Sequence, residues 1–182
     1  LADCVESAQG NPAVTPTDAL SNGVFSYGNR LYCQWSEDGR LAKFAWGSAD
    51  SYSRYYQDYQ QFVARSREVA AALEASAAID EQRIYVVKLD LSAFFDGIDI
   101  PTLVNKLRKE YAQFTKADPT RLPGDDQFWL AAEQVLTMNW APEDEKRAGL
   151  LKGGTLPKGL PQGLMASGFL ANAYLLDFDR AM

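Results

Sequence analysis

The sequence contains no histidine, and this absence excludes several kinds of enzyme chemistry. Without an imidazole the chain has no Ser-His or Cys-His nucleophile system, no histidine zinc ligand and no general base of the usual near-neutral type. The two cysteines, Cys4 and Cys33, are too few for a disulfide framework and lack metal-ligand spacing, so we expect them to be reduced and cytoplasmic. Any chemistry must therefore use carboxylates, hydroxyls, lysines or a metal ion held by oxygen.

Long apolar runs and excess basic charge are also missing. No run approaches the roughly 20 apolar residues that span a bilayer, and residues 1–18 have neither the basic nor the apolar segment of a secretory signal. We therefore expect no membrane partner. The net charge is −6, and a division after Arg83 leaves 7 basic and 11 acidic residues before it and 11 and 13 after it. Neither part is basic, which counts against a protein that coats nucleic acid.

The 182 residues, 47% of them hydrophobic, suit one domain or one lobe of a larger protein, and their patterns predict an α+β fold. Residues 1–22 are predicted to be irregular. A hairpin is predicted from strands at 23–35 and 41–46 with a turn at 36–40. A long helix should follow, and its stripe of tyrosines and phenylalanine is interpreted as a core face. Further predictions are a central strand at 83–90, helices at about 101–116, 126–140 and 164–182, and a loop at 141–154.

The stretch "VVKLDLSAFFDGI", residues 86–98, ends an apolar strand pattern with a carboxylate, Asp90. A buried carboxylate is costly unless a cation, a metal ion or hydrogen-bond donors meet it. Two interpretations remain open for this segment. Asp90 and the carbonyl oxygen of Leu91 offer the hard ligands that Mg²⁺ prefers, or Asp90 caps the next helix by accepting backbone N–H bonds.

A second stretch, "TLPKGLPQGLMASGFLAN", combines an extended approach with small residues. Pro157 and Pro161 stiffen the backbone, and Gly159 and Gly163 permit close approach to another body. Gln162 presents an amide that both donates and accepts hydrogen bonds. These features indicate a surface laid against a ligand, although small residues also serve a helix packed closely on a sheet.

Together the two stretches resemble motifs of reverse transcriptases. "DLSAFFDGI" resembles the first metal-binding motif, and "GLPQGLMASGFLANAYLLDFD" resembles the second palm motif, about 70 residues later. The resemblance covers about residues 84–180 and is looser over 23–75. "MASGFLAN" replaces the Ser-Pro usual in group II intron and retron enzymes, so the chain is most similar to the orphan and abortive-infection, phage-defence types.

The resemblance implies roles for individual residues. Asp90 matches the first metal-binding aspartate, and Leu91 supplies a carbonyl ligand. Phe95 matches the aromatic residue that crowds the sugar 2′ position and so selects deoxynucleotides. Gln162 matches the amide that lines the incoming nucleotide, and Gly163 allows the chain to approach that nucleotide.

The implied activity is RNA-directed DNA synthesis by two-Mg²⁺ phosphoryl transfer, with deoxynucleoside triphosphates and a nucleic acid template and primer as partners. Arg30 on the predicted hairpin could reach the triphosphate, with Lys43 or Arg40 as alternatives. The architecture implied is a fragment of a right-hand polymerase, with fingers at 1–83 and an incomplete antiparallel palm sheet with packed helices at 84–182.

The family's paired metal-binding aspartates should follow the second motif, and we do not interpret Asp177 and Asp179 as substitutes. We therefore expect the chain to need the remainder of the polymerase and to be inactive alone. One rival class, the aspartate-nucleophile phosphohydrolases, requires a second aspartate where Ser92 stands. A second rival, favoured by the acidic charge, is a polymerase-like scaffold that binds RNA or a partner without synthesis.

Overall fold

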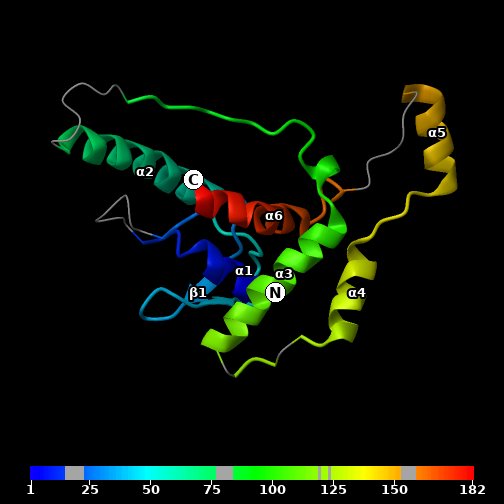
Figure 1. Ribbon diagram of the computed structural model, residues 1–182, viewed down its shortest axis with the longest axis horizontal. Helices are drawn as coiled ribbons and strands as arrows, with labels where there is room; N and C mark the ends of the chain where they lie inside the picture. Colours follow the sequence, from blue (N-terminus) through cyan, green and yellow to red (C-terminus); the bar gives the residue numbers. More distant parts are fainter. Residues whose placement is uncertain (15–22, 77–83, 119, 123, 153–158) are drawn as a thin grey trace. The chain divides into compact units, whose positions relative to one another are not determined.

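The computed structural model describes residues 1–14, 23–76, 84–118, 120–122, 124–152 and 159–182. Within them the fold is α+β, with helices and one small antiparallel sheet of two strands (Figure 1). The elements are α1 (Ala2–Gln9), β1 (Cys33–Trp35), β2 (Ala42–Phe44), α2 (Tyr55–Ala75), the 3₁₀ turn η1 (Phe95–Gly97), α3 (Ile100–Ala117), α4 (Asp126–Leu136), α5 (Pro142–Lys152) and α6 (Ser167–Ala181). None of these helices is long and apolar enough to cross a membrane.

The predicted hairpin is confirmed, with shorter strands than expected. β1 and β2 pair in antiparallel register, so that Cys33 lies opposite Phe44 and Trp35 opposite Ala42. The turn between them is closed by a hydrogen bond from the Ser36 N–H to the Leu41 carbonyl oxygen at 2.9 Å. Both cysteines are free thiols, and burial raises the pKa of Cys33 to about 12.

Helix α1 covers the edge of β2 that β1 does not use. The Asp3 carboxylate accepts a hydrogen bond from the Phe44 N–H at 2.7 Å, and the Ser7 hydroxyl accepts one from the Ala42 N–H at 2.8 Å. These bonds satisfy backbone donors that an edge strand otherwise exposes. The prediction of irregular structure over 1–22 was therefore wrong for residues 2–9, and residues 15–22 lie outside the described part of the chain.

The aromatic stripe of α2 does not form a core face, so that interpretation was wrong. Tyr55, Tyr56, Tyr59 and Phe62 are each at least half exposed. The buried residue of this helix is Asp58, whose carboxylate accepts a hydrogen bond from the Ser53 hydroxyl. The one buried side chain of this helix is thus a hydrogen-bonded carboxylate, and the tyrosine hydroxyls tolerate water.

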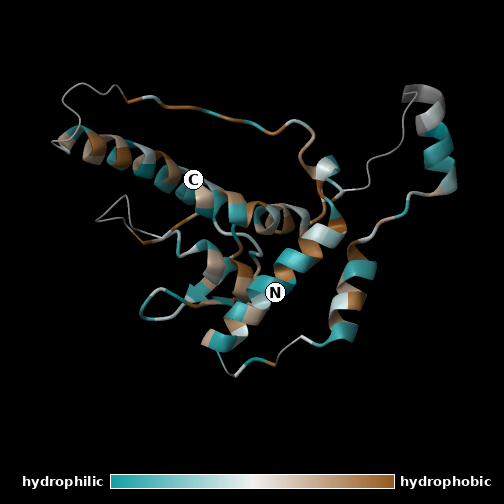
Figure 2. Cartoon of the chain, in the orientation of Figure 1, coloured by the Kyte–Doolittle hydropathy of each residue, from teal (hydrophilic) through white to brown (hydrophobic). Residues whose placement is uncertain are grey.

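The central strand predicted at 83–90 is also wrong over the described residues 84–90. This segment has no strand pairing, and the side chains of Tyr85, Val86, Val87 and Leu89 are between 71% and 89% exposed. Figure 2 shows the apolar character of this segment between α2 and η1. The chemical pattern is that of a buried strand, but no other described strand lies beside it to accept its backbone hydrogen bonds.

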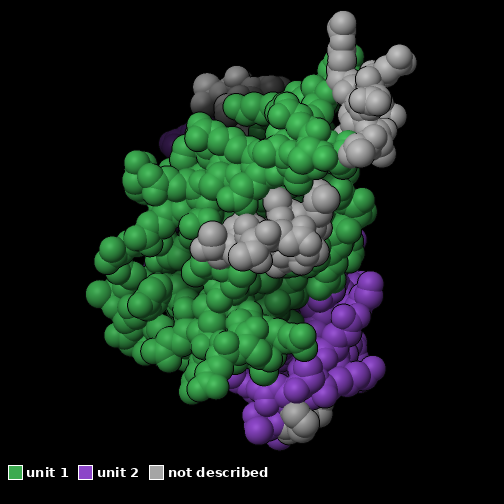
Figure 3. All heavy atoms as spheres, turned by 90° about the vertical axis from the view of Figure 1, so that its left-hand side faces the viewer, with its two compact units in different colours: residues 1–90, 176–182 green, residues 91–175 purple. Residues whose placement is uncertain are grey.

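The chain divides into two compact units (Figure 3). Residues 1–90 with 176–182 form unit 1, and residues 91–175 form unit 2. The division falls between Asp90 and Leu91, seven residues after the boundary expected from the sequence, and the end of α6 belongs to unit 1. The assignment of the two parts to fingers and palm stays a prediction.

The core of unit 2 is built on the amphipathic helix α3. Its predicted position is confirmed, and its inner face buries Leu103, Leu107 and Phe114. Asp99 caps its first turn, with the carboxylate accepting the Thr102 N–H at 2.9 Å. Helix α4 packs beside α3, and its Trp129 is only 4% exposed. The ring centroids of Trp129 and Tyr111 lie 5.9 Å apart in an edge-to-face arrangement.

Two further helices complete the described part of the chain. Residues 142–152 were predicted to be a loop, but they form α5, which begins with a proline and three acidic residues. Proline and acidic side chains both favour the first turn of a helix. Helix α6 confirms the predicted last helix and begins at Ser167, whose hydroxyl donates to the Pro161 carbonyl oxygen at 2.6 Å.

Candidate functional site

The turn after Leu91 and the Gly159–Leu160 segment are in direct backbone contact within unit 2. The Leu160 N–H donates to the Phe95 carbonyl oxygen at 2.9 Å. A Cβ atom on Gly159 would overlap that same oxygen and would stand 2.8 Å from the Asp96 carbonyl oxygen. Only glycine fits this approach, because the atoms that it meets belong to backbone. The structure therefore joins the two stretches that the sequence singled out.

The turn is shaped by its own backbone. Ala93 adopts a left-handed conformation with φ of 51°, which is uncommon for a residue with a side chain. The Gly97 N–H then closes the turn by donating to the Ala93 carbonyl oxygen at 3.1 Å. Phe95 is half-buried, and its ring centroid lies 5.9 Å from that of Phe94. The ring centroid of Phe94 also lies 6.2 Å from that of Tyr174. The Phe95 ring thus packs against that of Phe94.

Gln162 and Gly163 occupy an exposed turn ahead of α6. Gly163 has φ of 90°, so glycine is required here by the backbone conformation, and no described atom lies within 4 Å of the position that a Cβ atom would take. The turn is anchored by the buried Ser167, which binds the Pro161 carbonyl oxygen. The side chain of Gln162 is exposed and accessible to a ligand.

Asp90 belongs to unit 1 and Leu91 is the first residue of unit 2, and both are exposed. The buried strand end that the sequence predicted is not formed, so Asp90 does not carry the desolvation cost that raised the question of its partner. Asp90 does not cap the next helix, because Asp99 performs that role. The side chain of Leu91 is more than half exposed to solvent.

A complete metal site is not assembled by the described residues. Among them, no group of three or more histidine, cysteine, aspartate or glutamate side chains is placed to hold an ion. Asp90 and the Leu91 carbonyl offer oxygen ligands of the type that Mg²⁺ accepts, but one carboxylate does not hold two ions. Asp177 and Asp179 lie on α6, and burial raises the pKa of Asp179.

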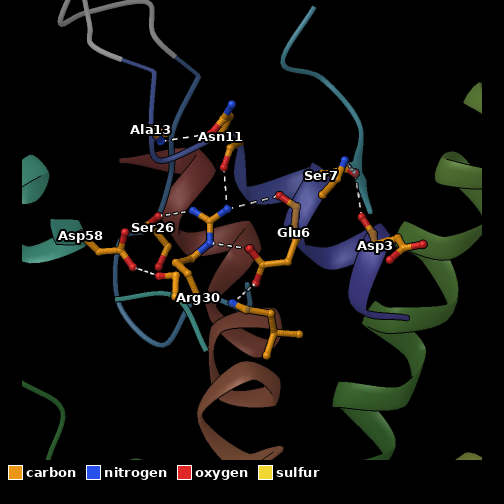
Figure 4. Close-up of polar contacts among 12 residues, drawn as sticks. Asp3, Glu6, Ser7, Asn11, Ala13, Ser26, Arg30 and Asp58 are labelled. Carbon is orange, nitrogen blue, oxygen red and sulfur yellow. Dashed lines mark hydrogen bonds and ion pairs between the residues drawn. The ribbon is translucent and has the colours of Figure 1, made fainter. Parts of the chain in front are cut away.

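Arg30 does not fit the triphosphate role expected for it. Its side chain is fully buried in unit 1, where its Nε donates to the Glu6 carboxylate at 2.8 Å (Figure 4). Its terminal nitrogens donate to the carbonyl oxygens of Ser26 and Gly10, each at 2.5 Å. The other Glu6 oxygen accepts the Leu31 N–H at 2.9 Å. The guanidinium ties three segments of unit 1 together and is withdrawn from solvent.

The charge balance at Glu6 follows from this burial. Desolvation raises the pKa of Glu6, and the opposing effects of the Arg30 charge and the Leu31 N–H favour the carboxylate.

The alternatives to Arg30 on the hairpin, Lys43 and Arg40, are both exposed. Either remains available to an anionic ligand of unit 1.

A pocket of about 320 Å³ lies beside the contact between the two stretches and was not foreseen from the sequence. It is lined by Asp96, Met138, Trp140 and residues 159–162, all in unit 2. Trp140 follows α4 in the segment "TMNW". A tryptophan in a short connection between two helices was the available signal, because such a large apolar side chain is rarely left without a partner.

Unit 1 contains a larger pocket, of about 570 Å³, whose described lining includes none of the residues expected at the site. Its walls combine the aromatic residues Tyr32, Trp35 and Tyr52 with the amides of Gln57 and Gln61.

No family model matches this chain, and neither does any curated protein or solved structure.

Proposed function

We propose that this chain forms part of a reverse-transcriptase-like polymerase that transfers deoxynucleotides to a primer, in the manner of the phage-defence types. One observation carries the proposal, namely the backbone contact between the two motif-bearing stretches at Phe95 and Leu160. In a nucleotide site the residue that meets the sugar and the residue that lines the incoming nucleotide must lie close together. The contact holds Phe95 close to the Gly159–Gln162 turn, which supports the proposal.

Each residue then has a defined task. Gln162 lines the incoming nucleotide with an exposed amide, and the left-handed Gly163 leaves space on that side. Phe95, held by Phe94, would meet a 2′-hydroxyl with its ring and so disfavour ribonucleotides. Asp90 and the Leu91 carbonyl would hold Mg²⁺, which neutralises phosphate charge when bound. Further ligands are needed, so we propose that the chain is inactive alone and acts in the cytoplasm together with the rest of a polymerase.

The proposal is tested by comparing the binding of dATP and ATP, each with Mg²⁺, to the 182-residue chain. We expect dATP to bind more tightly, and we expect Phe95→Val to reduce this difference because the smaller side chain admits the 2′-hydroxyl. Phe128→Val, on the exposed side of α4, is the matched control and should leave the ratio unchanged. Absence of nucleotide binding, or an equal ratio in wild type and Phe95→Val, would contradict the proposal.

One observation favours a second function, that of a polymerase-like scaffold for RNA or a protein partner. The apolar side chains of residues 85–89 are largely exposed, as at a surface that another chain covers. Asp90→Ala separates the two functions in a polymerase that contains this chain. Loss of DNA synthesis with retained folding supports catalysis, whereas an unchanged biological effect supports the scaffold.

A further inference from the structure

The pocket beside the Phe95–Leu160 contact has a composition that restricts what it can bind. Among the described residues that line it, Asp96 is the only charged one, and Gln162 is the only one with a side-chain amide. Trp140 and Met138 supply aromatic and polarisable surface, and residues 159–161 complete the described lining. These described walls contain no lysine or arginine, so they offer no cation to a phosphate group.

A planar heterocycle with hydrogen-bond donors fits this lining. Nucleobases stack on tryptophan, and about 320 Å³ is the lower end of the range for small-ligand pockets. An ionised carboxylate accepts hydrogen bonds and cannot donate them. The pocket therefore favours a base whose edge presents donors toward Asp96.

Guanine is the base that meets this requirement best. Its N1–H and its 2-amino group are adjacent donors that can meet both oxygens of one carboxylate. Adenine and cytosine each present one amino group beside a ring nitrogen acceptor, and the N3–H of thymine or uracil stands between two carbonyl oxygens. A carboxylate would repel these neighbouring acceptors, so the discrimination comes from both attraction and repulsion.

We propose that the pocket lined by Asp96, Trp140 and Gln162 binds a guanine base, with Asp96 accepting its two adjacent N–H donors. This inference rests on the proposed function and adds to it a base that is read by the protein's own side chains. A polymerase with such a pocket selects one base independently of template pairing. The guanine can belong to a free nucleotide or to a nucleotide within a single strand, because both present the same edge.

The experiment is a tryptophan-fluorescence titration of the 182-residue chain with dGTP, dATP, dCTP and dTTP. We expect dGTP to bind about tenfold more tightly than the others, in line with bidentate recognition of a base. The fluorescence change should disappear in Trp140→Phe, while dGTP binding measured by equilibrium dialysis persists. A parallel titration with dG and dA oligonucleotides identifies which molecule carries the guanine. Tighter binding of dGTP than of the dG oligonucleotide indicates a free nucleotide, and the reverse order indicates a nucleotide within a single strand.

Asp96→Asn is the decisive variant, because it replaces one acceptor oxygen with a donor at nearly constant shape. The preference for dGTP should fall to about twofold or less while dATP binding is retained. Asp144→Asn makes the same change on the exposed face of α5 and should leave the preference intact. Asp96→Ala provides a second route to the same loss, with circular dichroism confirming that each variant is folded.

Three outcomes separate this inference from the function on which it rests. Equal binding of all four nucleotides, or a dGTP preference that survives in folded Asp96→Asn, overturns the guanine pocket and leaves the nucleotide site standing. Absence of any nucleotide binding overturns both. Preference for dGTP that is lost in Asp96→Asn and kept in Asp144→Asn supports the inference.

Discussion

Replacing Gly159 by alanine tests the contact on which the candidate site is built. The added methyl group would overlap the Phe95 carbonyl oxygen and would crowd the Asp96 carbonyl group. Neither obstacle is the flexible end of a side chain, so relief requires one backbone segment to move. Such a movement would break the hydrogen bond from the Leu160 N–H to Phe95.

The expected cost combines two contributions. Overpacking in a filled site costs about 1–3 kcal/mol, and loss of one hydrogen bond adds about 0.5–1.5 kcal/mol, so the free energy of unfolding should fall by about 1.5–4.5 kcal/mol. The matched control is Gly97→Ala, in the same turn. Gly97 does not have a positive φ and has no described atom within 4 Å of the added Cβ, so its replacement should cost less than about 0.5 kcal/mol.

Urea unfolding followed by circular dichroism gives the stability of each variant. Amide hydrogen exchange gives a local readout, because the Leu160 N–H is protected by its bond to Phe95 and should exchange faster in Gly159→Ala. If Gly159→Ala were as stable as Gly97→Ala and its Leu160 amide remained protected, the two stretches would not be in contact.

Two further predictions concern stability. Glu6→Gln should lower the free energy of unfolding by about 3–5 kcal/mol, because it leaves the buried Arg30 charge without its partner. Asp126→Asn, in the exposed pair with Arg108, should cost less than about 1 kcal/mol, and equal costs in urea unfolding would refute the buried pair. Hydrogen bonds from the Thr102 hydroxyl and N–H lower the pKa of Asp99 from its ordinary value of 3.8. The unfolded chain therefore binds the Asp99 proton more readily, and stability that is present above pH 3.8 is lost as the pH falls through the folded-state pKa. Asp99→Asn keeps a capping oxygen that does not titrate, so its acid unfolding curve should be less steep than that of wild type, and identical curves would contradict the assignment.

Three elements that follow apolar periodicity or turn chemistry were predicted correctly. These are the hairpin with its turn at 36–40, helix α3 with Pro101 in its first turn, and the last helix. All three follow from local rules that the structure keeps. The close approach at Gly159 was also foreseen as a possibility, because the glycine stands in an otherwise stiff, proline-flanked segment.

The errors arise where tertiary hydrogen bonds decide burial. Helix α1 buries Asp3 and Glu6, which lie on one face three residues apart. Apolar periodicity cannot identify such a face, because its partners are the β2 edge and the Arg30 guanidinium. Arg30 was assigned to a ligand for the same reason, since a sequence does not reveal that a charge is buried and paired.

The apolar segment 84–90 shows a different limit. Its composition is that of a buried strand, but a strand is defined by neighbours, and the described residues supply none. The pocket residues Asp96 and Trp140 were not grouped in advance because they are 44 positions apart in the sequence and belong to different connections.

The central claim is that Asp90 holds Mg²⁺ against the phosphates of a deoxynucleotide. Its most direct test is the affinity of the chain for dATP with and without Mg²⁺, in wild type and in Asp90→Asn, which keeps the shape of the side chain and removes its charge. We predict that Mg²⁺ strengthens dATP binding to wild type and that Asp90→Asn abolishes this enhancement. An enhancement of equal size in both proteins, or no dATP binding to either, would contradict the account.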